Sequence, residues 1–276
     1  MNLTNQPNGR SKGLAKQMVE AGRDSWEIEI TGGPLIERPS DPNYNYTDLV
    51  DSYWPASIAA IQYYTNKITT QYVGHSNGCR VALSSLEKYQ TTGRSNVAKV
   101  QNLQTGSYVT VNLQGSQSTP IVNTFVGTGC PGAFEGDSPV MSALRSIGDR
   151  AFNNLEQSSN THPTVGETLR NILLASPGGA GIEGRMSLNL LRDYKRLIDQ
   201  TSDPQPGNFS VNKSLIFYGN TPAFSGSDFV VSIEDNLAIH NGLISQNKDL
   251  ETTNLNHFFI VDGSNVKRKI KEKLGG

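Results

Sequence analysis

The sequence lacks any apolar stretch that approaches the ~18 residues needed for a transmembrane helix. Residues 1–13 are polar and contain no apolar segment of the kind found in a signal peptide. The chain also lacks an excess of positive charge, because its formal net charge is −1. We therefore expect no membrane span, and neither nucleic acid nor an anionic membrane as a bulk partner.

Cysteine and histidine are scarce, with two and four residues respectively. Two cysteines cannot form the disulfide framework of a small secreted domain, and no group of Cys and His has the spacing of zinc ligands. We therefore expect no structural zinc site. Charged residues make up only 18% of the chain, whereas Asn, Gln, Ser and Thr are numerous. This composition favours an extracellular or cell-surface protein, whose signal would have been removed, but it does not identify the compartment.

The length of 276 residues and the hydrophobic content of 36% allow a sizeable core. Such a chain forms either one α/β domain with an insertion or two small domains. Apolar periodicity and turn residues predict four helices: one at 10–22, one that begins near residue 52, one that follows Ser76 and ends near residue 88, and one at 265–274. They also predict strands at 26–30, 69–73, 121–126 and 214–218. Residues 97–103 and 108–113 flank a turn and predict a β-hairpin.

The most informative stretch is Gly-x-Ser-x-Gly at residues 74–78, which follows a strand and begins a helix. In that setting the serine occupies a sharp, strained turn, so the positions two residues before and after it need small side chains. Gly74 and Gly78 meet this requirement. The helix that follows Ser76 directs its N–H groups at the reacting centre. The alternative interpretation is a glycine-rich turn that carries a solvated serine.

The segment Gly74-His75-Ser76-Asn77-Gly78 resembles the nucleophile elbow of the α/β-hydrolase superfamily, in its esterase and lipase branches. The resemblance covers the chain from about residue 10 to its end, but three short motifs carry it. It implies an α/β fold, with a mostly parallel sheet, helices on both faces and a helical cap insertion. The β-hairpin at 97–113 is unlike the family pattern, and we interpret it as an insertion into this fold. In this superfamily the catalytic residues follow the chain order Ser, Asp or Glu, then His.

The resemblance implies that Ser76, Asp228 and His257 form a catalytic triad. His257 lies in a polar loop before an apolar run and a last helix, where the family has its general base. An ordinary loop histidine is the alternative. We interpret the other three histidines differently. His75 supports the turn, His162 is a capping or surface residue, and His240 is a solvated residue.

Asp228 is the expected acid, because it precedes two valines at 230–231 in the manner of the family's aspartate. Glu234 and Asp235 are reserves that fit better as carboxylates at a helix N-terminus. Asn77 is expected to supply one oxyanion-hole N–H. The second donor should come from the loop before the first helix, for which residues 5–9 are the best candidates.

The resemblance also divides the chain. Residues 1–134 and 206–276 are expected to form the hydrolase core, with the hairpin insertion at about 97–113. Residues 135–205 interrupt the βα rhythm with helix candidates at 138–156, 163–175 and 186–200, and they are expected to form a cap or lid.

The start of the sheet departs from the family pattern, and the state of the two cysteines stays open. The family begins with two or three further strands, so either the sequence starts inside the domain, which we favour, or another segment completes the sheet. In the family the strands before Cys79 and Cys130 are neighbours, which makes a disulfide geometrically possible. Two buried free thiols are nevertheless the favoured state.

The predicted activity is hydrolysis of carboxylic esters by a lipase-like serine esterase without a cofactor, acting on a small-molecule or lipid ester. Thioesterase, amidase, peptidase and polyester depolymerase chemistry stay open, because fold and triad do not fix the leaving group. A binding or surface module that has lost catalysis is the alternative from a different class. The oligomeric state is not predicted.

Overall fold

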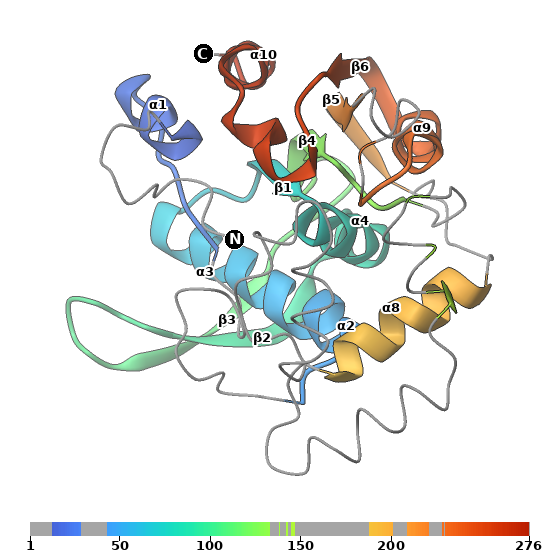
Figure 1. Ribbon diagram of the computed structural model, residues 1–276. Helices are drawn as coiled ribbons and strands as arrows, with labels where there is room; N and C mark the ends of the chain where they lie inside the picture. The colour runs from blue at the N-terminus through green and yellow to red at the C-terminus, as the bar shows by residue number, and fades with distance from the viewer. Residues whose placement is uncertain are drawn as a thin grey trace.

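Figure 1 shows the computed structural model of the chain. It describes residues 13–28, 43–132, 138, 142, 145–146, 188–200, 209–220, 228 and 230–275. Within these residues the central element is a four-stranded sheet in the order β1-β4-β5-β6, with all neighbours parallel. Its strands are β1 (Thr70–His75), β4 (Val122–Thr128), β5 (Ser210–Gly219) and β6 (Ile244–Thr253). The carboxyl ends of parallel strands share one edge, where such sheets usually bind ligands.

Helices cover both faces of this sheet, as the resemblance implies. Helices α3 (Trp54–Thr65), α4 (Asn77–Tyr89) and α9 (Ile233–Gly242) belong to one hydrophobic cluster. Helices α1 (Leu14–Glu20) and α10 (Ser264–Lys273) belong to a second cluster.

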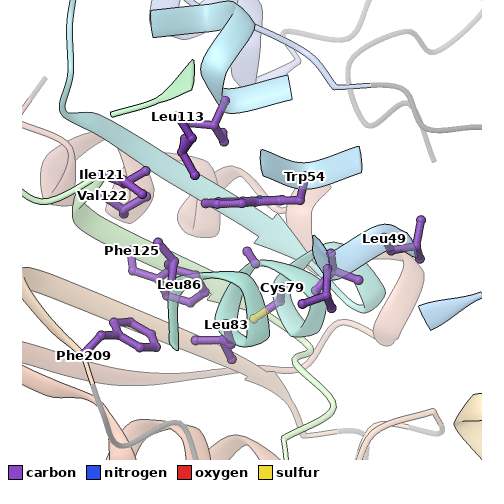
Figure 2. Packing of buried hydrophobic residues seen from close by; sticks show 14 of the residues in the cluster. Leu49, Trp54, Cys79, Leu83, Leu86, Leu113, Ile121, Val122, Phe125 and Phe209 are labelled. Carbon is purple, nitrogen blue, oxygen red and sulfur yellow. The ribbon is translucent and has the colours of Figure 1, made fainter. Parts of the chain in front are cut away.

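The alternation of side chains along the strands separates the two clusters. Phe125 of β4 and Ile216 of β5 join the first cluster, whereas the adjacent Val126 and Leu215 join the second. Figure 2 shows the first cluster, in which α4 and α3 pack together over β4 through residues that include Trp54, Leu83, Leu86, Ile121 and Phe125. The start of α4 is thereby fixed directly beside the ends of β1 and β4.

The predicted hairpin is present as an antiparallel pair, β2 (Arg94–Gln101) and β3 (Tyr108–Leu113). It forms a two-stranded sheet of its own and packs against α3. Val100 and Val111 face this helix and are buried. The turn of the hairpin extends away from the central sheet, at the left of Figure 1.

Part of the predicted cap region lies within the described residues. Helix α8 (Leu188–Gln200) is present where a helix was predicted at 186–200. It packs against α2 (Tyr46–Asp48), which continues through a π-helical turn, Leu49–Tyr53, into α3. The Tyr46 N–H donates to Asp193 Oδ2 at 2.9 Å. The helices predicted at 138–156 and 163–175 lie largely outside the described residues, so the cap stays a prediction.

Two predictions of secondary structure were incomplete or wrong. Strand β6 was not predicted, because as an edge strand it is largely exposed and its polar sequence shows no apolar alternation. A strand was predicted at 26–30, but the described part, 26–28, is not a strand. Trp26 instead stacks on Tyr64, with ring centroids 5.8 Å apart. No helix in the described part of the chain is long and apolar enough to cross a membrane.

The expectation of two free thiols was wrong, because Cys79 and Cys130 form a disulfide. Cys79 lies in the first turn of α4, and Cys130 follows the end of β4. Since β1 and β4 are adjacent and parallel, these turns leave the same edge of the sheet, and the two Cα atoms lie 5.6 Å apart. Both cysteines are fully buried. The disulfide joins the helix that follows Ser76 to the loop that follows β4.

We predict that the double variant Cys79→Ala/Cys130→Ala loses about 4 kcal/mol of unfolding free energy, because the bridge closes a long loop of the unfolded chain. The sequence separation of the two cysteines is 51 residues. Urea denaturation with and without a reducing agent measures the effect. The reducing agent should destabilise the wild type and leave the double variant unchanged. Equal stability of oxidised wild type and double variant would contradict this role.

Candidate active site

Ser76 occupies a strained backbone conformation between β1 and α4, with φ 49° and ψ −121°. Such a positive φ is costly for a residue with a side chain and is held only where the surroundings fix it. A Cβ on Gly74 would lie 2.7 Å from the Cα of Cys79, so this position requires glycine. A Cβ on Gly78 would meet nothing closer than the Tyr72 hydroxyl at 3.8 Å. The steric requirement expected at both glycines therefore holds at Gly74 alone.

Asp228 and His257 form a buried hydrogen-bonded pair, although they are 29 residues apart in the chain. The His257 Nδ1 lies 2.8 Å from Asp228 Oδ2, and both residues are at most 2% exposed. The second oxygen, Oδ1, accepts hydrogen bonds from the N–H groups of Val230 at 2.8 Å and Val231 at 2.5 Å. These bonds fix the carboxylate. Because an ionised carboxylate only accepts, Nδ1 carries the proton and Nε2 presents a lone pair.

Glycines at the ends of β4 and β5 make room for this pair. Gly129 has φ +55°, and a Cβ there would lie 2.8 Å from His257 Nδ1. A Cβ on Gly219 would lie 2.7 Å from the Cβ of Asp228. Any side chain at either position would displace the hydrogen-bonded pair.

The same loop connects the pair to the serine. The Ser76 N–H donates to the carbonyl oxygen of Thr128 at 3.0 Å, and Gly129, the next residue, lies against His257. The structure thus brings Ser76 and the Asp228–His257 pair to one end of the sheet, on either side of residues 128–129. The sequence showed a glycine-rich loop at this edge, but it gave no sign of the contact between Gly129 and His257.

His75 packs beside His257, with ring centroids 4.8 Å apart. Its Nδ1 lies 3.0 Å from the carbonyl oxygen of Thr128, so Nδ1 must donate and Nε2 is unprotonated. Burial and, after it, the neighbouring His257 lower the pKa of His75 well below its usual range. His75 is therefore neutral near pH 7, and it adds no positive charge beside His257.

Asn77 begins α4 directly after Ser76. The N–H groups of Cys79 and Arg80 both donate to the carbonyl oxygen of Ser76, at 3.0 and 3.2 Å. The N–H of Asn77 comes earlier in α4, where backbone N–H groups have no acceptor within the helix. The proposed source of a second oxyanion donor, residues 5–9, lies outside the described residues.

The remaining candidates have other surroundings. Glu234 and Asp235 lie in the first turn of α9, where the Asp235 Oδ2 accepts from the hydroxyl of the N-cap residue Ser232 at 2.9 Å. His240 lies in the last turn of the same helix. His162 falls outside the described residues. Across the described ranges, no group of His, Cys, Asp and Glu has the arrangement of a metal site.

No protein-family model and no curated protein matches the sequence. Solved structures resemble the fold. The monoacylglycerol lipase of Paleococcus ferrophilus has a TM-score of 0.52 at 12% identity, over 98% of this chain and 90% of that chain. A hydrolase from Pseudomonas aeruginosa PA01 has a TM-score of 0.50 at 11% identity, over 91% of this chain and 79% of that one.

At these identities the likeness establishes the fold and not the activity. It agrees with the parallel sheet and with the strand-turn-helix arrangement around Ser76. The chain has the α/β-hydrolase fold, as the elbow motif predicted.

We predict that His75 makes the protein less stable in mild acid. Because its folded pKa is depressed, the unfolded chain binds a proton below pH ~6.5 that the folded chain does not, so stability falls as pH decreases through that value. The loss is up to about 1.4 kcal/mol per pH unit.

The variant His75→Asn should flatten this dependence, since its amide can still donate to the Thr128 carbonyl without binding a proton. Urea denaturation of both proteins between about pH 7.5 and 5.5 measures it. Parallel stability curves for wild type and variant would show that His75 does not carry the effect.

Proposed function

We propose that this protein is a serine hydrolase that cleaves carboxylic esters through an acyl-enzyme. Ser76 is the nucleophile, His257 the general base, and Asp228 the residue that orients His257. The observation that carries the proposal is the buried 2.8 Å hydrogen bond between Asp228 and His257, next to the serine elbow. A serine hydroxyl is a poor nucleophile at neutral pH and needs such an oriented imidazole to take its proton.

The proposed reaction begins when Ser76 Oγ attacks the ester carbonyl and His257 Nε2 accepts the hydroxyl proton. Asp228 stabilises the imidazolium so formed. The N–H of Asn77 donates to the developing oxyanion. Collapse of the tetrahedral intermediate expels the alcohol, which takes the proton from His257. Water, deprotonated by His257, then attacks the acyl-enzyme and releases the acid and free Ser76.

The surroundings of His257 support this sequence of steps. The fixed Asp228 carboxylate leaves His257 in the tautomer whose Nε2 accepts a proton. A neutral His75 avoids repulsion of the imidazolium that forms during each half-reaction. The predicted cap over the serine favours esters of medium or long acyl chains, and the likeness to a monoacylglycerol lipase agrees with a lipid-like ester.

We predict that Ser76→Ala reduces hydrolysis of p-nitrophenyl esters by at least about 10³-fold, since the covalent route is lost. A series from acetate to palmitate, followed by the absorbance of the released p-nitrophenolate, also ranks the acyl chains. Ser95→Ala, a change of an exposed serine on β2, is the control and should retain full turnover. Serine-independent turnover would contradict the nucleophile. No turnover of any ester by the folded wild type would favour an amide or thioester substrate or a non-catalytic module.

We predict that Gly129→Ala lowers kcat by about 10²-fold, because its methyl group would displace His257 from its position. Gly22→Ala is the matched control. Gly22 has a similar φ of +77°, but a Cβ there would meet no atom within 4 Å, so the change adds backbone strain without a steric contact. Steady-state kinetics on a soluble ester compare the two variants. Equal kcat values would show that the space at Gly129 is not needed for catalysis.

A further inference from the structure

Asn236 is a fully buried amide on α9 that has no part in the proposed chemical steps. Its Oδ1 accepts a hydrogen bond from the N–H of Cys130 at 3.0 Å. Its Nδ2 donates to the carbonyl oxygen of Ser232, the N-cap residue of α9, at 2.9 Å. A primary amide has one acceptor group and one donor group, so both ends of this side chain are used. The amide therefore joins the loop after β4 to the start of α9.

The two segments that Asn236 joins both contact the buried hydrogen-bonded pair. Residues 228–232 include the acid, and two of their N–H groups hold its carboxylate. Gly129 in the loop after β4 lies against both members of the pair. A Cβ there would be 2.8 Å from His257 Nδ1 and 3.4 Å from Asp228 Oδ2. The amide thus controls the spacing between the two segments that enclose the pair.

The surroundings of the amide leave the loop little freedom to move. A Cβ on Gly132 would overlap the carbonyl oxygen of Asp235 and lie 2.8 Å from Ile239 Cγ1, so the loop approaches α9 with no side chain between them. Cys130 is fully buried, as is the amide that accepts its N–H. Without the amide this N–H would lose its acceptor in a site without water, which is costly. The loop would therefore shift to find another partner.

Other bonds hold the same loop on the side of the nucleophile. The disulfide joins Cys130 to Cys79 of α4, and the Arg80 guanidinium donates to the carbonyl oxygen of Gly132. Both partners belong to the helix that follows the serine. The connection to the segment that carries the acid comes from Asn236. Removal of this amide should therefore change the acid side of the site and leave the serine side in place.

We propose that Asn236 is a positioning residue for the reaction. It ties the loop after β4 to α9 and so keeps Gly129 against His257. The imidazole thereby stays aligned with the Asp228 carboxylate and with the Ser76 hydroxyl. This inference rests on the proposed function, because it assigns the role in relation to that triad. A residue that served folding alone would change the free energy of unfolding and leave kcat of the folded protein unchanged.

The variant Asn236→Ala tests the assignment, with Gln90→Ala as its matched control. Gln90 is also a buried amide, which donates to the carbonyl oxygen of Val122 and accepts from its N–H, at the amino end of the sheet. Urea denaturation should show that both variants lose stability. With a soluble p-nitrophenyl ester, Asn236→Ala should lose kcat at least about tenfold with little change in KM, and Gln90→Ala should keep wild-type kcat. Similar kcat values for the two folded variants would overturn the proposal.

The proton between His257 and Asp228 gives a second readout that needs no turnover. A proton in such a short hydrogen bond to a carboxylate is strongly deshielded and resonates far downfield in the ¹H NMR spectrum. Its resonance should be lost or shifted in Asn236→Ala and kept in Gln90→Ala. An unchanged resonance in Asn236→Ala would contradict the positioning role. If the resonance responds as expected but the wild type cleaves no ester, the proposed hydrolysis fails and the positioning of His257 is supported.

Two variants of nearly the same shape as the amide keep the proposal testable if Asn236→Ala does not fold. Asn236→Leu offers neither hydrogen bond, whereas the protonated carboxyl of Asn236→Asp offers one donor and one acceptor, as the amide does. Burial raises the pKa of such a carboxyl, which favours this protonated form at about pH 6.5. Asn236→Asp should therefore retain several-fold more kcat at that pH than Asn236→Leu. Equal kcat values would show that the two hydrogen bonds do not position His257.

Discussion

The buried hydrogen bond between Asp228 and His257 is the constraint on which the arrangement at the sheet edge depends. A carboxylate and an imidazole without access to water are stable there only if each finds fixed partners. Two backbone N–H groups hold the carboxylate, and glycines at 129 and 219 leave the space that the pair occupies. The backbone at the ends of β4 and β5 therefore leaves the space that the buried pair requires.

The disulfide extends this constraint to the serine. Cys79 follows Ser76 by one turn of α4, while Cys130 follows Gly129 directly. The bridge thus joins the first turn of α4, which follows Ser76, to the loop after β4, in which Gly129 contacts His257. A buried bridge at this point agrees with an oxidising compartment, where disulfides form and persist. The hairpin lies outside this arrangement and packs on α3.

The sequence allowed the fold and the order of the candidate residues to be predicted, because short motifs determine local geometry. Strand, Gly-x-Ser-x-Gly and helix can adopt few arrangements, and Ser76 lies where they require it. Strand β6 could not be predicted, since an edge strand with polar faces has no hydrophobic period. Neither could the contacts of Gly129 and His75 with His257, nor the disulfide, because these depend on how separate strands align.

The most direct test of the account is the rate at which a fluorophosphonate reacts with Ser76, measured by peptide mass spectrometry in wild type and in Asp228→Asn. Fluorophosphonates phosphonylate serines that a neighbouring base activates. The account predicts one adduct, on Ser76, which forms at least about 10²-fold more slowly in Asp228→Asn because His257 loses its orienting carboxylate. An adduct on another serine, or equal rates in the two proteins, would contradict it.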